Sequence, residues 1–309
     1  MAQARLLDTK DQLVGRDMRN SALELGRAMP RLTAEARRIS GAVAAGIHGR
    51  RRSGQGDSFW QFRTFTSGES AHRVDWRRSA RDDRLYVRER EWEAAETLWL
   101  WLDRSPSMAF QSDMAKTSKL ERGVVLGLAL ADMLVRGGER VGLLGLGTPT
   151  ASRRVIETLA EQLVLAASPA QQRPMARAIG LREEAILIGD FIGAVEEITS
   201  EWTTISGNGG RAHVVMIADP IEEVFPYAGE TEFIDPETGD RLRVGDAALF
   251  RQRYVDRLAA HRDALRVAAT RLGWTFSLHR TDRPASDVIL HLSALLAEGS
   301  GLSQTMSGR

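Results

Sequence analysis

The chain of 309 residues contains no cysteine, so disulfides and thiolate metal sites are excluded. No apolar run is long enough to span a bilayer: the longest, at residues 124–130, runs into Asp132, whereas a spanning helix needs about 20 apolar residues. The 42 lysines and arginines nearly balance the 41 aspartates and glutamates, so no excess charge attracts nucleic acid or an anionic membrane. The N-terminus lacks the apolar core of a signal peptide. We therefore expect a soluble, cytoplasmic protein with no membrane span and no nucleic-acid partner.

An Asp-x-Ser-x-Ser motif is the feature of the chain that points most directly to chemistry. Asp103, Ser105 and Ser107 follow an apolar, aromatic-rich segment at residues 97–102 that is typical of a buried strand. One carboxylate and two hydroxyls at a strand end can converge as hard oxygen ligands for a small divalent cation. The motif predicts a site for magnesium, or for manganese or calcium in its place. The same residues also suit a capped turn in which the serines bond to backbone, and the pattern leaves that open.

From residue 96 onward, strand-like and helix-like segments alternate. Such alternation predicts an α/β fold with a doubly wound, mostly parallel sheet covered by helices on both faces. The expected elements lie at residues 97–102, 119–136, 140–146, 155–167, 185–188, 194–205, 213–218, 247–272 and 274–278. A hairpin insertion is expected within residues 219–246, either as a docking surface or as a plain structural flap.

The first 90 residues have a different character. A helix is expected at residues 32–46, opened by Thr33, and strand-like pieces at residues 59–65 and 85–90, separated by Arg- and Gly-rich segments. We therefore predict three parts. They are an N-terminal α+β extension at residues 1–92, an α/β domain at residues 93–298 and a flexible tail at residues 299–309.

Two further aspartates end apolar, strand-like segments. Asp190 follows Ala-Ile-Leu-Ile-Gly, and Asp219 follows His-Val-Val-Met-Ile-Ala. In a doubly wound sheet, residues that end adjacent central strands meet at the same crevice. We therefore expect Asp190 to join Asp103 at the metal site, and do not include Asp219 among the predicted ligands. The alternative for Asp190 is the N-cap of the helix that follows it, which is a common role for such an aspartate.

The chain resembles a known family, the one catalogued as domain of unknown function number 58. The resemblance covers most of the chain and rests on several segments in order, together with a late helix that contains Tyr254 and His261. The segments are RRRSGQGDSFWQFRTFTSGE, RVDWRRSARDDRLYVREREWE, DRSPSM, IGDF and IADPIEEVFPYAGETEFIDPETGD. The resemblance implies a fold similar to the von Willebrand factor A domain, of Rossmann type, and association with a MoxR-type AAA+ ATPase.

In von Willebrand factor A-like domains, a D-x-S-x-S loop, a threonine from a second loop and an aspartate from a third form a metal-ion-dependent adhesion site. By this resemblance the ligands here are Asp103, Ser105, Ser107 and Asp190. No matching threonine lies between residues 151 and 184, and Ser168 is the nearest hydroxyl that could take its place.

This combination implies adhesion rather than turnover. Magnesium prefers an octahedral shell of oxygens, so a few protein ligands leave a position for the Asp or Glu of a partner. We expect a metal-dependent protein-binding module that acts as an adaptor or co-chaperone for a MoxR-type ATPase. We do not expect an enzyme. One alternative is a magnesium-dependent phosphohydrolase, although the chain lacks the G-x-S-x-G, P-loop and H-E-x-x-H motifs. Another is a structural domain with a vestigial metal loop.

Overall fold

The computed structural model describes residues 3–6, 18–50, 59–66, 74–81, 84–90, 96–166, 177–181, 183–207 and 209–306. It divides into two compact units. Unit 1 consists of Met1–Ala45 together with Glu96–Arg309, and unit 2 of Gly46–Ala95. The extension predicted at residues 1–92 is therefore shared between the two units, because most of its helix belongs with the α/β part of the chain.

A six-stranded sheet in the order β11-β8-β7-β4-β5-β6 forms the centre of unit 1. All neighbours from β11 to β5 run parallel, and β6 pairs antiparallel with β5 at one edge. The strands are β4 (Thr97–Leu102), β5 (Arg140–Leu143), β6 (Leu146–Thr150), β7 (Glu183–Gly189), β8 (Arg211–Ala218) and β11 (Thr275–Arg280). This arrangement confirms the predicted α/β class with a mostly parallel sheet. The single strand predicted at residues 140–146 is wrong, because Gly145, with φ of 81°, turns the chain between β5 and β6.

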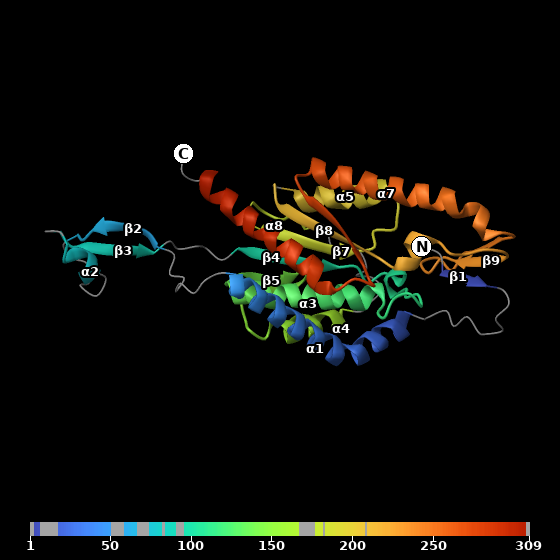
Figure 1. Cartoon of the computed structure of the whole chain (residues 1–309), viewed down its shortest axis with the longest axis horizontal. Helices are drawn as coiled ribbons and strands as arrows, with labels where there is room; N and C mark the ends of the chain where they lie inside the picture. The colour runs from blue at the N-terminus through green and yellow to red at the C-terminus, as the bar shows by residue number, and fades with distance from the viewer. Residues whose placement is uncertain are drawn as a thin grey trace. The chain divides into compact units, whose positions relative to one another are not determined.

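Helices cover both faces of the sheet (Figure 1). One face carries α3 (Lys119–Gly137), α4 (Val155–Leu165) and α8 (Ala285–Met306), and the other carries α5 (Val195–Ser206) and α7 (Arg251–Arg271). The chain adds β5 on one side of β4 and then crosses to add β7 on the other side. The direction of winding therefore reverses between β4 and β7, and in open α/β sheets ligands bind at such a switch point.

Helix α1 (Met18–Arg50) is longer than the helix predicted at residues 32–46. Its buried apolar side chains recur every three or four residues across Pro30: Leu25, Met29, Leu32, Ala36, Ile39 and Val43. Thr33 does not open the helix but lies within it, and its hydroxyl donates to the carbonyl of Pro30, three residues earlier, at 2.9 Å. The stripe of apolar side chains, rather than the local start signal, sets the extent of the helix.

Polar contacts attach α1 to the α/β part of unit 1. Arg31 pairs with Glu121 of α3 at 2.5 Å, and Arg37 pairs with Glu157 of α4. The buried hydroxyl of Ser40 donates to Oδ2 of Asp132 in α3 at 2.5 Å. These contacts explain why α1 groups with the sheet.

The insertion between β8 and α7 contains the predicted hairpin. After α6 (Pro220–Val224), strand β9 (Thr231–Ile234) pairs antiparallel with β10 (Arg241–Val244) and, on its other edge, with β1 (Gln3–Leu6). The 3₁₀ turn η4 (Ala247–Phe250) then leads into α7. At the other end of the domain, α8 continues to Met306, so the segment predicted as a tail is helical up to that residue.

Beyond the end of α1, the described residues of unit 2 form a two-stranded antiparallel sheet and a short helix. Strand β2 (Phe59–Thr64) pairs with β3 (Tyr86–Arg90), and Asp75 caps α2 (Trp76–Ser79) by accepting from the amide of Arg78. No helix in the described ranges of either unit combines the length and the apolar character needed to cross a membrane.

Candidate metal centre

Aspartates follow the ends of three adjacent parallel strands. Asp103 follows β4, Asp190 follows β7 and Asp219 follows β8. Leu102 pairs with Ile188, and the amide of Asp103 donates to the carbonyl of Ile188 at 2.8 Å. Asp103 therefore lies beside the end of β7, at the switch point of the sheet.

Gly189 allows this close approach. A Cβ atom at position 189 would lie only 2.8 Å from Cβ of Asp103 and 3.1 Å from its Oδ2. Any larger residue would have to displace the carboxylate of Asp103 or separate the two strands. Gly189 thus allows the carboxylate of Asp103 to lie close to the end of β7, where Asp190 follows.

The D-x-S-x-S loop turns its polar groups inward. Oδ1 of Asp103 accepts from the amide of Ser105 at 2.8 Å, and the hydroxyls of Ser105 and Ser107 lie 3.0 Å apart. The Ser107 hydroxyl also forms a hydrogen bond with Asp190. The structure therefore brings together four of the five predicted ligands, whereas Ser168 lies outside the described residues. That these groups bind a cation stays a prediction.

Arg104, between the first two motif residues, fixes the loop to a helix end. Its guanidinium donates to the carbonyls of Leu163 and Ala166, at 3.3 and 2.6 Å, at the C-terminus of α4. These carbonyls have no partner within the helix, and an arginine at this end satisfies them.

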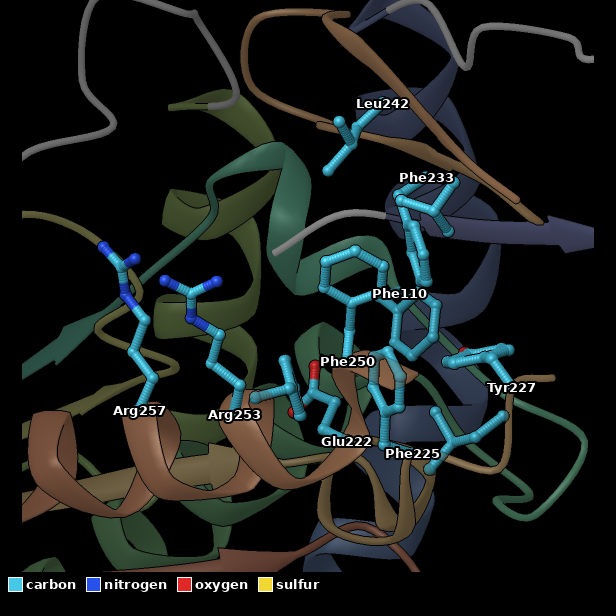
Figure 2. A pocket seen from close by; sticks show the side chains of 12 residues that line it. Phe110, Glu222, Phe225, Tyr227, Phe233, Leu242, Phe250, Arg253 and Arg257 are labelled. Atoms are coloured by element: carbon cyan, nitrogen blue, oxygen red, sulfur yellow. The ribbon is translucent and has the colours of Figure 1, made fainter. Parts of the chain in front are cut away.

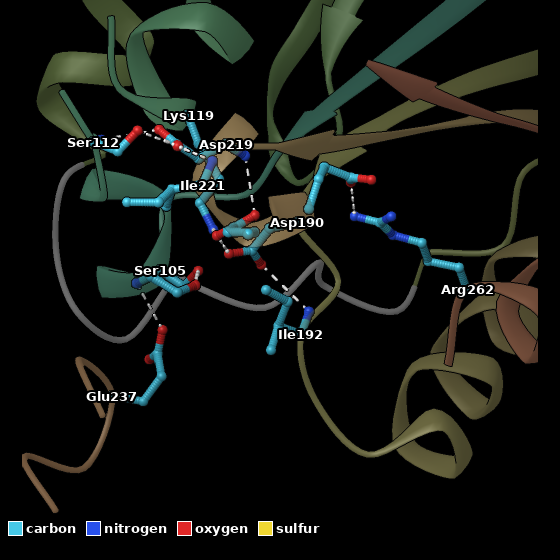
Figure 3. Close-up of polar contacts among 12 residues, drawn as sticks. Ser105, Ser112, Lys119, Asp190, Ile192, Asp219, Ile221, Glu237 and Arg262 are labelled. Carbon is cyan, nitrogen blue, oxygen red and sulfur yellow. Dashed lines mark hydrogen bonds and ion pairs between the residues drawn. The ribbon is translucent and has the colours of Figure 1, made fainter. Parts of the chain in front are cut away.

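Lys119 is a member of the site that the sequence analysis did not identify. Its side chain is fully buried, and Nζ lies 2.7 Å from Oδ2 of Asp190 and 2.9 Å from Oε1 of Glu222 (Figure 3). Burial by itself would lower the pKa of Lys119, but Asp190 and Glu222 raise it above its usual value, so the ammonium stays charged. One signal was available: Lys119 lies on the same face of α3 as buried Gly123 and Leu126.

The two carboxylates of the predicted site have opposite pKa shifts. Burial, which leaves Asp103 only 7% exposed, and the nearby charge of Asp190 raise the pKa of Asp103 to about 7. Burial would also raise the pKa of Asp190, but the ammonium of Lys119 lowers it below its usual value. Asp190 is therefore ionised at neutral pH, whereas Asp103 loses its proton only near pH 7.

Asp219 has a structural role instead. It caps α6 in a capping box with Glu222, and its carboxylate accepts from both the amide and the hydroxyl of Ser112. The alternative considered for Asp190, a helix N-cap, is not realised, since Ala194 occupies the N-cap of α5.

A carboxylate from another part of the chain also contacts the loop. Glu237, in the connection between β9 and β10, accepts from the amide of Ser107 at 3.0 Å, and Figure 3 shows its side chain directed at the loop. The charge of Glu237 adds to the rise in the pKa of Asp103. The sequence predicts the hairpin but not this contact, because the register of the hairpin and the position of its tip depend on the fold.

The residue after Asp190 has a strained backbone. Phe191 has φ of 48°, a left-handed conformation that is unfavourable for a residue with a Cβ. Its ring packs between those of Trp101 and Trp202, with centroids 5.9 and 5.6 Å away, and its carbonyl contacts Nε2 of His261 at 2.8 Å. Strain held in place by packing is frequent beside functional groups.

The donor set is chemically suited to a hard cation. It offers two carboxylates and two hydroxyls, which magnesium, manganese and calcium accept. Around it, the ammonium of Lys119 contacts the carboxylates of Asp190 and Glu222. Asp103 and Glu237 add further carboxylates at the loop, so a divalent ion would offset negative charge that Lys119 leaves unbalanced. The described residues contain no group of three His, Cys, Asp or Glu side chains placed to hold a metal, so the serine hydroxyls would be essential.

The family model described as "Protein of unknown function DUF58" matches residues 61–264, more than half of the chain. The chain belongs to this family. A comparison with curated proteins gave no match.

Two solved structures resemble the chain. The conserved hypothetical protein BatB from Bacteroides thetaiotaomicron is 16% identical, with 66% of this chain and 100% of that chain covered and a TM-score of 0.32. An aerotolerance-related membrane protein from Bacteroides fragilis is 15% identical, with coverages of 63% and 96% and a TM-score of 0.35. TM-scores this low do not establish a common fold, so the family assignment rests on the family model alone.

Proposed function

We propose that this member of the family is a metal-dependent protein-binding module, an adaptor or co-chaperone for a MoxR-type AAA+ ATPase. The cation is magnesium, or manganese or calcium, in a von Willebrand factor A-like adhesion site. Asp103, Ser105 and Ser107 supply oxygen ligands, and Asp190 supplies a second carboxylate beside them. The ion provides a position at which a carboxylate of the partner completes the coordination shell.

The contact of Glu237 with the D-x-S-x-S loop is the observation that supports adhesion most directly. This exposed carboxylate is bound by the amide of Ser107 at 3.0 Å, within a loop that already contains the carboxylate of Asp103. The loop thus accepts an incoming acidic side chain despite the adjacent negative charge. A divalent ion would strengthen such an interaction, because coordination to a cation replaces repulsion between carboxylates.

Titration calorimetry with magnesium and manganese tests the metal requirement. We expect wild-type protein to give binding heat that is lost in the double variant Asp103→Ala/Ser105→Ala. Asp113→Ala is the matched control, since Asp113 is an exposed aspartate ten residues after Asp103 and should leave the heat unchanged. Equal heat from the wild type and the double variant would show that the ion binds elsewhere.

Capture of a MoxR-type ATPase on immobilised protein tests adhesion. The expected result is capture in magnesium, loss of capture in EDTA, and loss in the Asp103→Ala/Ser105→Ala variant even with magnesium present. Undiminished capture by that variant would contradict adhesion through the ion.

The buried Lys119 favours a second candidate, a structural domain that needs no metal. Its ammonium already occupies Oδ2 of Asp190 and lies 2.9 Å from Glu222, so a side chain supplies part of the positive charge that an ion would otherwise bring. If the domain is structural, neither magnesium nor manganese gives binding heat with the wild type. This result distinguishes a structural domain from an adhesion module.

A further inference from the structure

A cavity of about 320 Å³ lies beside the candidate metal centre, between the hairpin insertion and α7 (Figure 2). Its volume is at the lower end of the range of small-ligand pockets, about 300 to 1,000 Å³. Aromatic residues make up half of its lining: Phe110, Phe225, Tyr227, Phe233, Phe250 and Tyr254. Phe225 stacks on Tyr254 with centroids 4.5 Å apart and on Phe233 at 5.7 Å, so the wall is a packed aromatic cluster.

Apolar side chains are also exposed at the pocket. Leu242 of β10 is 62% exposed and Phe250 of η4 is 43% exposed, and both line the cavity. Large apolar side chains that gather at a concave surface, rather than being scattered singly, indicate a binding site. The pocket is therefore suited to a bulky apolar group.

Two arginines give the pocket a positive charge. Arg253 and Arg257 are one turn apart on α7, and Figure 2 shows both extending along the same side of the pocket. Both are exposed, and neither makes a hydrogen bond or an ion pair with any residue that the structure describes. The only carboxylate lining the pocket, Glu222, is paired with Lys119. The surface thus offers two guanidiniums, the donors best suited to a carboxylate.

The pocket is continuous with the candidate metal centre. Glu222 lines the pocket and accepts from the ammonium that binds Asp190. Phe110 follows the D-x-S-x-S loop by three residues, and the hairpin that supplies Phe233 and Leu242 also places Glu237 on that loop. A ligand long enough to reach both places would be a polypeptide segment rather than a compact molecule.

We propose that this pocket binds a segment of a partner protein in which a bulky apolar side chain lies next to a carboxylate. The apolar side chain enters the aromatic cavity, and the carboxylate is bound by Arg253 and Arg257. This inference rests on the proposed function, from which we take the ligand to be a partner protein. It adds a specificity pocket that requires no metal.

Methyl NMR of the full-length protein in EDTA tests the pocket, with Ile221, Leu242 and Val244 as reporters inside it. The probes are the peptides acetyl-Leu-Phe-Asp-amide and acetyl-Leu-Phe-Asn-amide, which differ only in the carboxylate. We expect the acidic peptide to shift these methyl signals and to bind at least fivefold more tightly than its amide counterpart. In Arg253→Gln/Arg257→Gln this preference should disappear, because the affinity for the acidic peptide falls to that for the amide peptide, which itself stays unchanged.

Arg271→Gln is the matched control. Arg271 is an exposed arginine at the other end of α7, about 27 Å from Arg253 at 1.5 Å per residue, and its replacement should preserve the preference. Equal binding of the two peptides, or a preference that survives in the double variant, would overturn the inference. So would occupation of the pocket by dodecanoate while neither peptide binds. Because EDTA removes metal from these titrations, a failure here is distinct from a failure of the magnesium titrations.

Discussion

At the residue scale, Gly189 controls the approach of Asp103 to Asp190. In Gly189→Ala the added Cβ would lie 2.8 Å from Cβ of Asp103, so we expect a loss of about 1–3 kcal/mol in the free energy of unfolding. Magnesium affinity should also fall, by about tenfold or more, because the carboxylate of Asp103 is displaced. Urea unfolding and calorimetry measure the two effects.

Gly193→Ala is the control for this prediction. A Cβ at position 193 would meet only Cδ1 of Ile198 at 3.7 Å, an ordinary contact. Stability and magnesium affinity should therefore stay close to those of the wild type. If Gly189→Ala matches Gly193→Ala in stability and magnesium affinity, the close contact between Asp103 and position 189 is not needed for the site.

His279 makes the stability of the fold depend on pH. The ring is 4% exposed, and burial, with a further contribution from Arg122, lowers its pKa to about 4. In the unfolded chain the pKa is about 6.5, so between pH 6.5 and 4 the unfolded state binds a proton that the folded state does not. The stabilising contribution of the neutral ring is complete above pH 6.5 and is lost as the pH falls. At pH 5 the loss is about 2 kcal/mol.

Urea unfolding of the wild type and of His279→Leu at pH 7 and pH 5 measures this contribution. The stability of the wild type relative to the variant should fall by about 2 kcal/mol between the two pH values. The comparison with the variant is needed because the raised pKa of Asp103 acts in the opposite direction over the same range. A difference between the two proteins that does not change with pH would contradict the assignment.

Single residues of the site differed in how far the sequence revealed them. Asp103, Ser105, Ser107 and Asp190 could be chosen because each follows an apolar segment at a strand end, and parallel strand ends meet at one edge of a sheet. Glu237 could not, because nothing local relates the tip of a hairpin to a loop 130 residues away. Lys119 was missed because lysines are rarely buried without a partner, and its partners are known only from the fold.

At the scale of elements, Lys119 joins the start of α3 to the end of β7 and to α6. Lys119→Met removes the ammonium and leaves the carboxylates of Asp190 and Glu222 buried without their partner. We expect a loss of about 3–5 kcal/mol in the free energy of unfolding, measured in urea. Lys116→Met, at an exposed position just before α3, should change stability little. A variant at position 119 as stable as that control would show that the ion pairs contribute nothing.

The elements themselves were predicted where the hydrophobic pattern is long and regular. The strands β4, β7 and β8 and the helices α3 and α5 are close to the predicted ranges, since their apolar runs reflect burial in the sheet and on its faces. The predicted start of α1 was wrong because Thr33 resembles a helix N-cap, whereas tertiary packing continues the helix through Pro30 and Thr33. The order of the strands could not be predicted from the hydrophobic pattern. It depends on the side of the sheet to which each crossover connection adds the next strand.

At the scale of the whole molecule, the order of the strands makes the site possible. Placing β5 and β7 on opposite sides of β4 creates the switch point at which Asp103 and Asp190 meet. The insertion between β8 and α7 then adds the hairpin, whose tip contacts the loop and whose strands complete the aromatic pocket. The proposed metal-dependent contact and the proposed apolar contact thus lie on one surface of unit 1.

Anomalous diffraction from crystals of the full-length protein grown with manganese is the measurement that tests the central claim most directly. We expect a manganese peak at the C-terminal ends of β4 and β7, at coordination distance from the oxygens of Asp103, Ser105 and Ser107, and no such peak in Asp103→Ala crystals. Wild-type crystals without a peak at these strand ends, at a manganese concentration that saturates other sites, would contradict the account.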